Sequence, residues 1–360
     1  MPNIQNVNLP IHPVILEDIA SITSNQKIQW DKLQSKTVLI TGASGLIGSY
    51  LVYTLVGLNE IKNANIKILA LVRNRSKAEL QFGKLLERDD LILLEKDVTE
   101  PLNTSEKIHY IFHTASKTGP KAMMEDPVGT IKANVLGTLQ LLEYSKKHNT
   151  IFIYLSSREI YGNTNPDIKV IPETEYGTLD PTIVRSCYPE SKRLSETLCV
   201  AYHHQHGVET KIARLAHTYG PDWSLGSGRV WGDFLLNETR GENIILKSDG
   251  RSELSFMYVA DAVSALFFIL LNSDEMVYNI SDASGVVQIR DLAEIIASLH
   301  PEKELKAVFE ISNENCYSTN KMAILDTEKI EKLGWKPEVT LAQGLLRTSL
   351  VFSDYLNIER

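Results

Sequence analysis

The segment Thr41-Gly42-Ala43-Ser44-Gly45-Leu46-Ile47-Gly48 decides how the chain begins to fold. It follows the apolar run 38–40 and opens a helical pattern over residues 46–58. A glycine-rich turn between a strand and a helix lets the backbone approach a pyrophosphate at the N-terminus of the helix. Glycines at such a turn also serve close packing, so the spacing becomes informative only together with other features.

A second motif, Tyr188-Pro189-Glu190-Ser191-Lys192, places a phenol and an ammonium four residues apart on one face of a predicted helix. Between the two motifs, the apolar run 151–155 leads into Ser156-Ser157, so that hydroxyls follow the carboxyl end of a strand. Open α/β sheets bind ligands at that edge. The order of these features predicts a dinucleotide site with a proton donor beside it.

Strand-like and helical patterns alternate through the first two thirds of the chain. Such alternation predicts an α/β fold with a parallel, doubly wound sheet of the Rossmann type. The predicted strands are 37–40, 66–72, 91–94, 110–113, 151–155 and 211–215, and the predicted helices are 46–58, 127–148 and 189–206.

We expect three parts along the chain. Residues 1–36 form an N-terminal extension, residues 37–216 the dinucleotide-binding domain, and residues 217–360 mainly a smaller, interleaved substrate-binding domain, because the pattern becomes irregular there. The extension contains Pro10, Pro13 and a short helical stretch at 15–22, without recognisable chemistry. It fits either a strap packed on the domain surface or a lid or dimer contact.

Charge and cysteine content exclude several classes of protein. The 360 residues include 37 Lys and Arg against 45 Asp and Glu, and the net charge of −8 offers no field attractive to nucleic acid or an anionic membrane. The longest apolar run, 265–271, is far shorter than the ~20 residues that cross a bilayer. Cys187, Cys199 and Cys316 are an odd number without metal-ligand spacing. We therefore expect a cytoplasmic protein with unpaired thiols and no metal site.

Further segments occur in the order typical of one large enzyme family. They are Asp97-Val98, HTAS at 113–116, NVLGT at 134–138, SSREIYG at 156–162, HTYGP at 217–221, YVAD at 258–261 and LGWKP at 333–337. With these marks, the chain from about residue 36 onward resembles the extended short-chain dehydrogenase/reductase family. That family includes nucleotide-sugar epimerases, dehydratases, decarboxylases and ketoreductases. The resemblance implies a nucleotide-sugar substrate and a homodimer.

The resemblance also implies a nicotinamide dinucleotide as the cofactor. Asp97 is expected to contact the adenine through its side chain or the neighbouring backbone. The other expected cofactor-binding residues are Gly42, Ser44, Gly45, Leu46, Ile47, Arg73, Asn74, Val98, Thr114, Ala115, Ser116, Asn134, Tyr188, Lys192 and Leu215.

The end of the second predicted strand bears on which dinucleotide is bound. An acidic side chain there accepts hydrogen bonds from the ribose 2′-hydroxyl of NAD, whereas a cation can hold the 2′-phosphate of NADP. This chain has Arg73-Asn74-Arg75 and no carboxylate. We therefore expect NADP(H), with NAD(H) as the alternative, although two arginines also fit an ordinary solvated helix start.

Tyr188 is expected to act as the acid and base, because a hydride moved to or from a sugar carbon must be matched by a proton at its oxygen. Lys192, together with an oxidised nicotinamide, should lower the pKa of the phenol and also anchor the ribose. Ser157 should orient the substrate oxygen.

Two positions depart from the family pattern. The dehydratases carry an Asp-Glu pair where this chain has Arg158-Glu159, and 4,6-dehydration is disfavoured because Arg cannot transfer a proton. Glu159 fits either a second acid/base or an ion-pair partner of Arg158. Decarboxylases and several epimerases place an Arg, which meets a diphosphate or a carboxylate, where this chain has Leu254. Arg251 or Arg229 could take over that role.

His217 stands where most relatives have an Asn that bonds the sugar nucleotide, and its imidazole could titrate near neutrality. Trp223 and Trp231 flank the loop through Arg229 and fit either stacking on the base or core packing. The expected substrate-binding residues are Ser157, Arg158, His217, Arg229 and Arg251.

These features lead us to expect an NADP(H)-dependent nucleotide-sugar oxidoreductase, in particular a 4-ketoreductase of a nucleoside-diphosphate 4-keto-6-deoxyhexose. A cofactor consumed in net reduction is usually the phosphorylated one, and the dehydratase carboxylate pair is broken. The alternative is a redox-neutral epimerase, dehydratase or UDP-glucuronate-type decarboxylase. A non-catalytic NADP(H)-binding regulator is a third interpretation, against which the intact Tyr188 and Lys192 argue.

Overall fold

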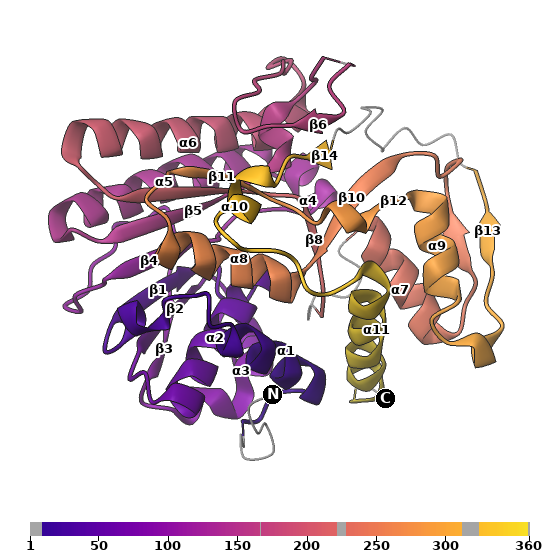
Figure 1. Cartoon of the computed structure of the whole chain (residues 1–360), viewed down its shortest axis with the longest axis horizontal. Coiled ribbons are helices and arrows are strands. Elements are labelled where there is room, and N and C mark those ends of the chain that lie inside the picture. Colours follow the sequence, from indigo (N-terminus) through magenta and orange to yellow (C-terminus); the bar gives the residue numbers. More distant parts are fainter. Residues whose placement is uncertain (1–8, 166, 222–227, 312–323, 359–360) are drawn as a thin grey trace.

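The computed structural model describes residues 9–165, 167–221, 228–311 and 324–358. Within them, seven parallel strands form one sheet in the order β11-β7-β5-β4-β1-β2-β3 (Figure 1). The order reverses between β1 and β4, which is the point where doubly wound folds bind ligands. The predicted fold class is confirmed. The strands are β1 (Thr37–Thr41), β2 (Lys67–Val72), β3 (Leu91–Glu95), β4 (Tyr110–His113), β5 (Ile151–Ser157), β7 (Thr210–Leu215) and β11 (Val277–Ile280).

Helices cover both faces of this sheet. Successive side chains of β1 point to opposite faces: Val38 and Ile40 join a core with α2 (Leu46–Lys62) and α8 (Val259–Asn272), whereas Leu39 joins a core with α5 (Pro127–His148) and α6 (Cys187–His206). Two short helices, α3 (Arg75–Phe82) and α4 (Pro120–Glu125), follow β2 and β4. No helix in the described ranges is long and apolar enough to span a membrane.

All the predicted strands and helices are present; strand 110–113 and helix 127–148 have the predicted ends, and the others have shifted ends. α2 continues past residue 58 through a polar last turn to Lys62, and it stops where Asn63 adopts a left-handed conformation with φ 51°. α6 begins at Cys187, before the predicted start at 189, because a 3₁₀ turn, η5 (Val184–Ser186), leads directly into it. The ends of α2 and α6 depend on local backbone geometry, which the pattern of apolar residues does not reveal.

The residues after 216 alternate between a smaller lobe and the large sheet. β8 (His217–Tyr219), β10 (Glu253–Tyr258) and β12 (Val286–Gln288) form a three-stranded sheet, and β9 (Ile244–Leu246) pairs with β13 (Ala307–Phe309). α7 (Val230–Arg240) and α9 (Ile289–Ala297) accompany these strands on one side of the molecule (Figure 1). In the sequence between β10 and β12, α8 packs against the large sheet and β11 forms its edge strand. β14 (Ile324–Leu325) pairs with β6 (Val170–Ile171), and α10 (Glu328–Lys332) follows it.

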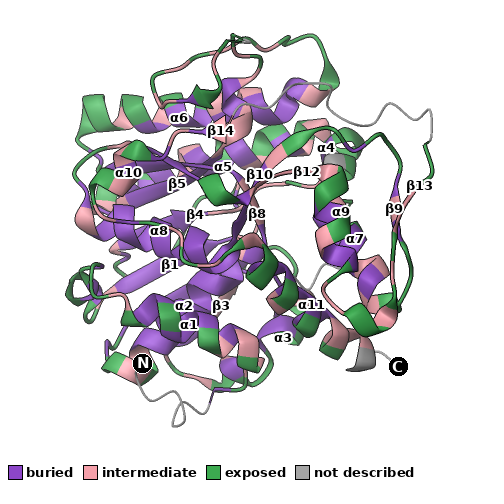
Figure 2. Cartoon of the chain, turned by 45° about the vertical axis from the view of Figure 1, so that its right-hand side comes forward, coloured by how far each residue is buried: buried purple, intermediate pink, exposed green. Residues whose placement is uncertain are grey.

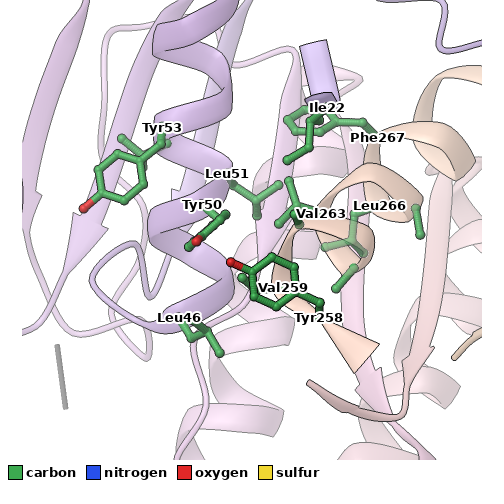
Figure 3. Packing of buried hydrophobic residues seen from close by; sticks show 14 of the residues in the cluster. Ile22, Leu46, Tyr50, Leu51, Tyr53, Tyr258, Val259, Val263, Leu266 and Phe267 are labelled. Atoms are coloured by element: carbon green, nitrogen blue, oxygen red, sulfur yellow. The ribbon is translucent and has the colours of Figure 1, made fainter. Parts of the chain in front are cut away.

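α8 is buried from Val259 to Leu271 and lies in the centre of the molecule (Figure 2). Its side chains Val259 and Val263 face Tyr50 and Leu51 of α2 (Figure 3). A helix that is apolar on all sides is expected to be enclosed in a core. α8 therefore joins the small lobe to the face of the sheet that carries α2.

The N-terminal helix α1 (Pro13–Ser24) packs against α2, α8 and the C-terminal helix α11 (Leu341–Ile358). At its centre, Asp18 is 2% exposed and accepts hydrogen bonds from Tyr50 at 2.9 Å and Tyr258 at 2.7 Å. Arg347 of α11 forms an ion pair with the same carboxylate at 2.8 Å. Burial raises the pKa of Asp18, although Arg347 opposes the shift. The contacts favour the strap interpretation of the extension.

Cys187 and Cys199 are buried thiols outside any disulfide. Cys316 and Trp223, which the sequence singled out, lie outside the described residues.

Candidate active site

The glycine turn has the geometry that a pyrophosphate requires. Gly42 has φ +65°, and a Cβ there would lie 2.8 Å from the Cα of Ala115, so only glycine fits. Gly45 is the N-cap of α2, and no described side chain caps the helix. The first backbone N–H groups of α2, at Leu46 and Ile47, therefore remain available to an anion. A dinucleotide fits this turn.

The end of β4 is fastened to the glycine turn. Thr114 donates a hydrogen bond to the carbonyl of Thr41 at 2.6 Å, and the Thr41 hydroxyl lies 2.8 Å from Nδ1 of His113. Burial and the Lys192 charge lower the pKa of His113 to about 3, so this imidazole is neutral. Thr114 and Ala115 thus shape the wall opposite Gly42, in agreement with their expected place at the cofactor.

Asn134 connects the β4 loop to the helix of the second motif. Its amide oxygen accepts from Ser116 at 2.7 Å, and its amide nitrogen donates to Ser191 at 2.8 Å. Asn134 is fully buried. These contacts occupy its amide group with protein partners, so the geometry favours a positioning role over the expected direct contact with a cofactor.

At the adenosine end, Arg73 is exposed directly after β2, and Asn74 caps α3 by accepting from the backbone N–H of Lys77 at 2.9 Å. Asp97 accepts from the backbone and hydroxyl of Thr99, which lower its pKa, and the Arg73 charge contributes to the same shift. Arg73 thus faces an ionised acid. Of the other expected residues, Val98 packs under α5 at Gly137, and Leu215 is buried at the end of β7.

Tyr188 and Lys192 lie one turn apart on α6, as the spacing predicts. The ammonium of Lys192 donates to the carbonyl of Leu155 at 2.7 Å and lies 5.8 Å from the ring centroid of Tyr188. Burial lowers the pKa of Lys192 to about 7. The side chain of Ser157 acts to lower the pKa of Tyr188. β5 and α6 therefore supply Ser157, Tyr188 and Lys192, three of the four expected catalytic residues.

The electrostatics of Tyr188 differ from our expectation. Burial and the Glu159 carboxylate raise its pKa to about 12. Ser157, Arg229 and Arg185 oppose this shift. In the chain by itself burial therefore outweighs the opposing groups, and the lowering expected from Lys192 together with an oxidised nicotinamide stays a prediction.

Glu159 lies on η4 (Arg158–Tyr161), the 3₁₀ turn that follows Ser157. Both of its carboxylate oxygens accept from Nη2 of Arg185, at 2.8 and 2.7 Å. The guanidinium carbon of Arg185 lies 5.9 Å from the ring centroid of Tyr188. The sequence patterns did not single out Arg185, although its position three residues before Tyr188 could have indicated a side chain near the phenol. The ion pair favours an electrostatic role for Glu159 over proton transfer.

Arg158 is partly buried beside this pair, and burial lowers its pKa to about 10 against the attraction of Glu159. On the other side, Arg229 is the N-cap of α7 and donates to the hydroxyl of Thr118 at 2.6 Å. His217 of β8 is partly buried with its ring beside Phe256, and burial with the charges of Arg158 and Arg229 holds its pKa well below the usual range. Its expected titration near neutrality is therefore wrong.

Arg251 and Trp231, which the sequence analysis considered for the substrate, lie apart from this site, and so does Leu254. Arg251 lies on an exposed turn, 3.7 Å from Asp249, and no contact within the described residues joins it to the other predicted substrate-binding residues. Trp231 is 3% exposed and packs against Tyr219, which favours core packing over stacking on a base. Leu254 pairs with Val287 of β12 and packs against the core.

A buried network lies next to the expected catalytic residues of β5 and α6. Glu196, one turn after Lys192 on α6, accepts from Ser156 and forms an ion pair with Arg214 of β7 at 2.7 Å. Arg214 also donates to the hydroxyl of Tyr161 at 2.8 Å. The two hydroxyls at the end of β5 thus differ: Ser156 joins the network, whereas Ser157 acts on the pKa of Tyr188.

Comparisons with known proteins define the class. The family model described as NAD dependent epimerase/dehydratase family matches residues 38–281. UDP-glucuronic acid decarboxylase 3 of Arabidopsis thaliana is 35% identical over 90% of this chain and 91% of its own length. UDP-glucuronic acid decarboxylase 1 of Xenopus tropicalis is 29% identical over 87% of this chain and 71% of its own. The chain belongs to the NAD-dependent epimerase/dehydratase family of extended short-chain dehydrogenases/reductases, which confirms the predicted family and the prediction of an enzyme.

Solved structures share the fold. UDP-glucose 4-epimerase of Thermotoga maritima, solved with UDP-glucose, has a TM-score of 0.75 at 24% identity and covers 89% of this chain and 99% of its own. An epimerase of Methanothermobacter thermautotrophicus has a TM-score of 0.78 at 21% identity, over 96% of this chain and 98% of its own. UDP-glucuronic acid 4-epimerase of Bacillus cereus, solved with UDP-glucuronic acid and NAD, has a TM-score of 0.73 at 21% identity, over 90% and 100%.

Proposed function

We propose that the protein is a redox-neutral enzyme that decarboxylates a nucleotide-linked hexuronic acid. The observation that carries this proposal is the convergence of Ser157, Tyr188 and Lys192 at the end of β5, within the sheet edge that also holds the uncapped N-terminus of α2. The decarboxylase relatives, which match 90% of the chain, support the uronate and the redox-neutral course.

The residues of the chain hold the sugar and move its proton. Tyr188 takes the proton of the sugar hydroxyl during oxidation and returns it during reduction, and Ser157 holds the same oxygen. Lys192, fixed by the carbonyl of Leu155, anchors the ribose. A bound nicotinamide supplies the hydride acceptor and, when oxidised, a positive charge that favours the phenolate.

Decarboxylation follows from the position of the ketone. Oxidation at C4 places a carbonyl β to the carboxylate on C5, and the C5–carboxylate bond can then break because its electron pair passes into the C4 oxygen as an enolate. Carbon dioxide leaves, and C5 takes a proton from solvent. Reduction of the C4 ketone, for which a bound nicotinamide would supply the hydride, restores the hydroxyl group as Tyr188 returns its proton to the oxygen. Arg158 cannot take part in the competing elimination of water, because a guanidinium does not transfer protons.

A 4-ketoreductase is the second candidate. Leu254 favours it, because the decarboxylases that this chain resembles carry an arginine at that position. The preference for NADP(H) belongs with this candidate and rests on Arg73. We expect the preference to be weak, because the charge of Arg73 already acts on Asp97 and Asp126.

The experiment offers the purified protein UDP-glucuronate and, separately, a panel of 4-keto-6-deoxy nucleotide sugars, while the absorbance of the reduced nicotinamide is followed. The decarboxylase proposal expects release of carbon dioxide from UDP-glucuronate without net change of the cofactor. Stoichiometric consumption of NADPH with a 4-keto sugar, and no conversion of UDP-glucuronate, would establish the reductase instead.

We also propose a cytoplasmic homodimer. α5 and α6 pack together and both leave large apolar side chains exposed, among them Ile131 and Leu136 on α5 and Leu194 and Val200 on α6. Burying such side chains against a second copy is favourable. Light scattering of the purified protein should give twice the mass of the chain, and a monomer at micromolar concentration would contradict the proposal.

A further inference from the structure

The ion pair between Arg185 and Glu159 joins the two segments that carry Ser157 and Tyr188. Glu159 follows Ser157 by two residues on η4, and Arg185 precedes Tyr188 by three residues on η5. Both carboxylate oxygens of Glu159 accept from Nη2 of Arg185, at 2.8 and 2.7 Å. The guanidinium carbon of Arg185 lies 5.9 Å from the ring centroid of Tyr188. The pair therefore lies beside the phenol that is expected to exchange the proton.

Another arginine already fastens η4 to α6. Arg193, which follows Tyr188 on α6, donates to the carbonyls of Ile160 and Gly177, both at 2.6 Å. Arg185 contacts a side chain instead, and its Nη1 is buried without a hydrogen-bond partner among the described residues. A buried donor without a partner is unfavourable. Hydrogen bonding by itself therefore does not account for the position of Arg185, whereas the charge of the carboxylate does.

The charges of this pair affect the proton of Tyr188. The residue is 6% exposed, and charges near a buried group are screened less than charges at the surface. Burial raises the pKa of Tyr188 to about 12, the Glu159 carboxylate adds to the rise, and Arg185 opposes it. The ion pair thus brings together two groups with opposite effects on the same phenol.

Other titratable groups in the described structure also lie around this phenol. They are Tyr154 of β5, Arg158 of η4, Cys187 and Lys192 of α6 and Arg229 of α7. Burial raises the pKa of the Tyr154 phenol and of the Cys187 thiol, so both stay neutral. Burial lowers the pKa of Lys192 to about 7, and Arg229 favours the phenolate as Arg185 does. The acidity of the phenol therefore depends on a balance between the Glu159 carboxylate and the arginines.

We propose that Arg185 is a positioning residue for the reaction, which holds the Glu159 carboxylate in place and balances its charge beside Tyr188. The inference rests on the proposed function only for the role of Tyr188 in proton transfer. With Arg185 in place, the phenol lies beside a paired carboxylate. Without Arg185, the negative charge of the carboxylate disfavours the phenolate more strongly, and the phenol gives up its proton less readily. Glu159 acts through its charge in this arrangement.

The test measures the acidity of residue 188 directly. A fluorinated tyrosine replaces Tyr188 in the full chain, because its phenol titrates at lower pH than that of tyrosine, and ¹⁹F NMR follows its ionisation without substrate or cofactor. Arg185→Gln should lower the acid dissociation constant of this phenol by about tenfold, the size expected when a nearby opposite charge is lost. Arg185→Lys should keep most of the acidity, because the charge remains.

A second set of variants isolates the part of Glu159. Glu159→Gln should raise the acid dissociation constant of residue 188, because it removes the negative charge. When Arg185→Gln is added to Glu159→Gln, it should lower the constant by a smaller factor than in the otherwise unmodified chain, because no carboxylate is left to balance. The difference between the two factors measures how far Arg185 acts through Glu159.

Arg193→Gln is the matched control, since Arg193 joins the same elements through main-chain carbonyls. It should lower the melting temperature and leave the acidity of residue 188 unchanged. Unchanged acidity in Arg185→Gln would overturn the inference, as would an equal decrease with and without Glu159. Whether or not Arg185→Gln folds, unchanged acidity in Glu159→Gln would overturn it too. A protein that shows these shifts but releases no carbon dioxide from UDP-glucuronate would sink the proposed function and leave the coupling of Arg185 to Tyr188 standing.

Discussion

The proposed cofactor site and the proposed sugar site lie at the same end of the large sheet, but they are built in different ways. One continuous segment, 41–48, supplies the glycine turn and the start of α2. The proposed sugar site instead takes Ser157 from β5, Tyr188 from α6, His217 from β8 and Arg229 from α7. The comparison teaches that backbone chemistry can be encoded locally, whereas the charge of a pocket arises from segments that only the fold brings together.

The largest expected effect concerns the chemistry of the pocket. Tyr188→Phe should lower turnover by about 10²–10⁴-fold and leave cofactor affinity nearly intact, because it removes a proton donor that acts in the transition state. Lys192→Ala should reduce both, since this ammonium also anchors the ribose. Single-turnover kinetics and cofactor titration measure the two quantities. Substantial turnover by Tyr188→Phe would assign the proton to another residue, with Glu159 the first to test.

The next effect concerns the N-terminal strap. Its Asp18 accepts hydrogen bonds from Tyr50 of α2, which follows the glycine turn, and from Tyr258 at the end of β10 in the smaller lobe. Asp18→Asn should lower the free energy of unfolding by about 3 kcal/mol, since Arg347 loses its buried partner. Glu17→Gln is the control: Glu17 pairs with the same arginine at 3.1 Å but is 58% exposed, so its loss should cost below about 1 kcal/mol. Denaturant unfolding measures both, and equal costs would contradict the role of the strap.

The cofactor edge is tested by a pair of glycines. Gly42→Ala should destabilise the protein by about 2 kcal/mol more than Gly83→Ala does, because both glycines have positive φ but only Gly42 faces a neighbour, the Cα of Ala115 at 2.8 Å. The extra cost should appear together with weaker binding of the dinucleotide. Thermal unfolding and cofactor titration measure these effects. Similar behaviour of the two variants would mean that the turn is less confined than its geometry indicates.

The smallest effect concerns the choice between the two dinucleotides. Arg73→Ala should lower the affinity for NADPH relative to NADH by only about 1 kcal/mol, because Arg73 is exposed. Arg75→Ala serves as the control, since Arg75 pairs with Glu79 at 2.7 Å. If the unmodified protein binds both cofactors equally, Arg73 does not read the 2′-phosphate.

Much of the site was predictable because its residues occupy fixed positions in regular elements. Tyr188 and Lys192 are four residues apart, so a helix must place them on one face, and Ser157 ends a strand whose carboxyl edge faces the ligand. The sequence motif singled out Asn134, but its buried hydrogen bonds with Ser116 and Ser191 depend on how α5 packs. A sequence pattern does not show which polar groups already form hydrogen bonds within the protein.

The sequence by itself determined the alternation of strands and helices, the glycine turn and the placement of Tyr188 and Lys192 on one helix face, because these depend on side chains a few positions apart. Only the tertiary structure decided that Glu159 pairs with Arg185, that the pKa of His217 is held low and that burial raises the pKa of Tyr188. Each of these outcomes depends on desolvation and on charges brought together from distant segments. Coulomb interactions and burial act through space, and the order of residues along a chain does not specify either of them before the chain has folded.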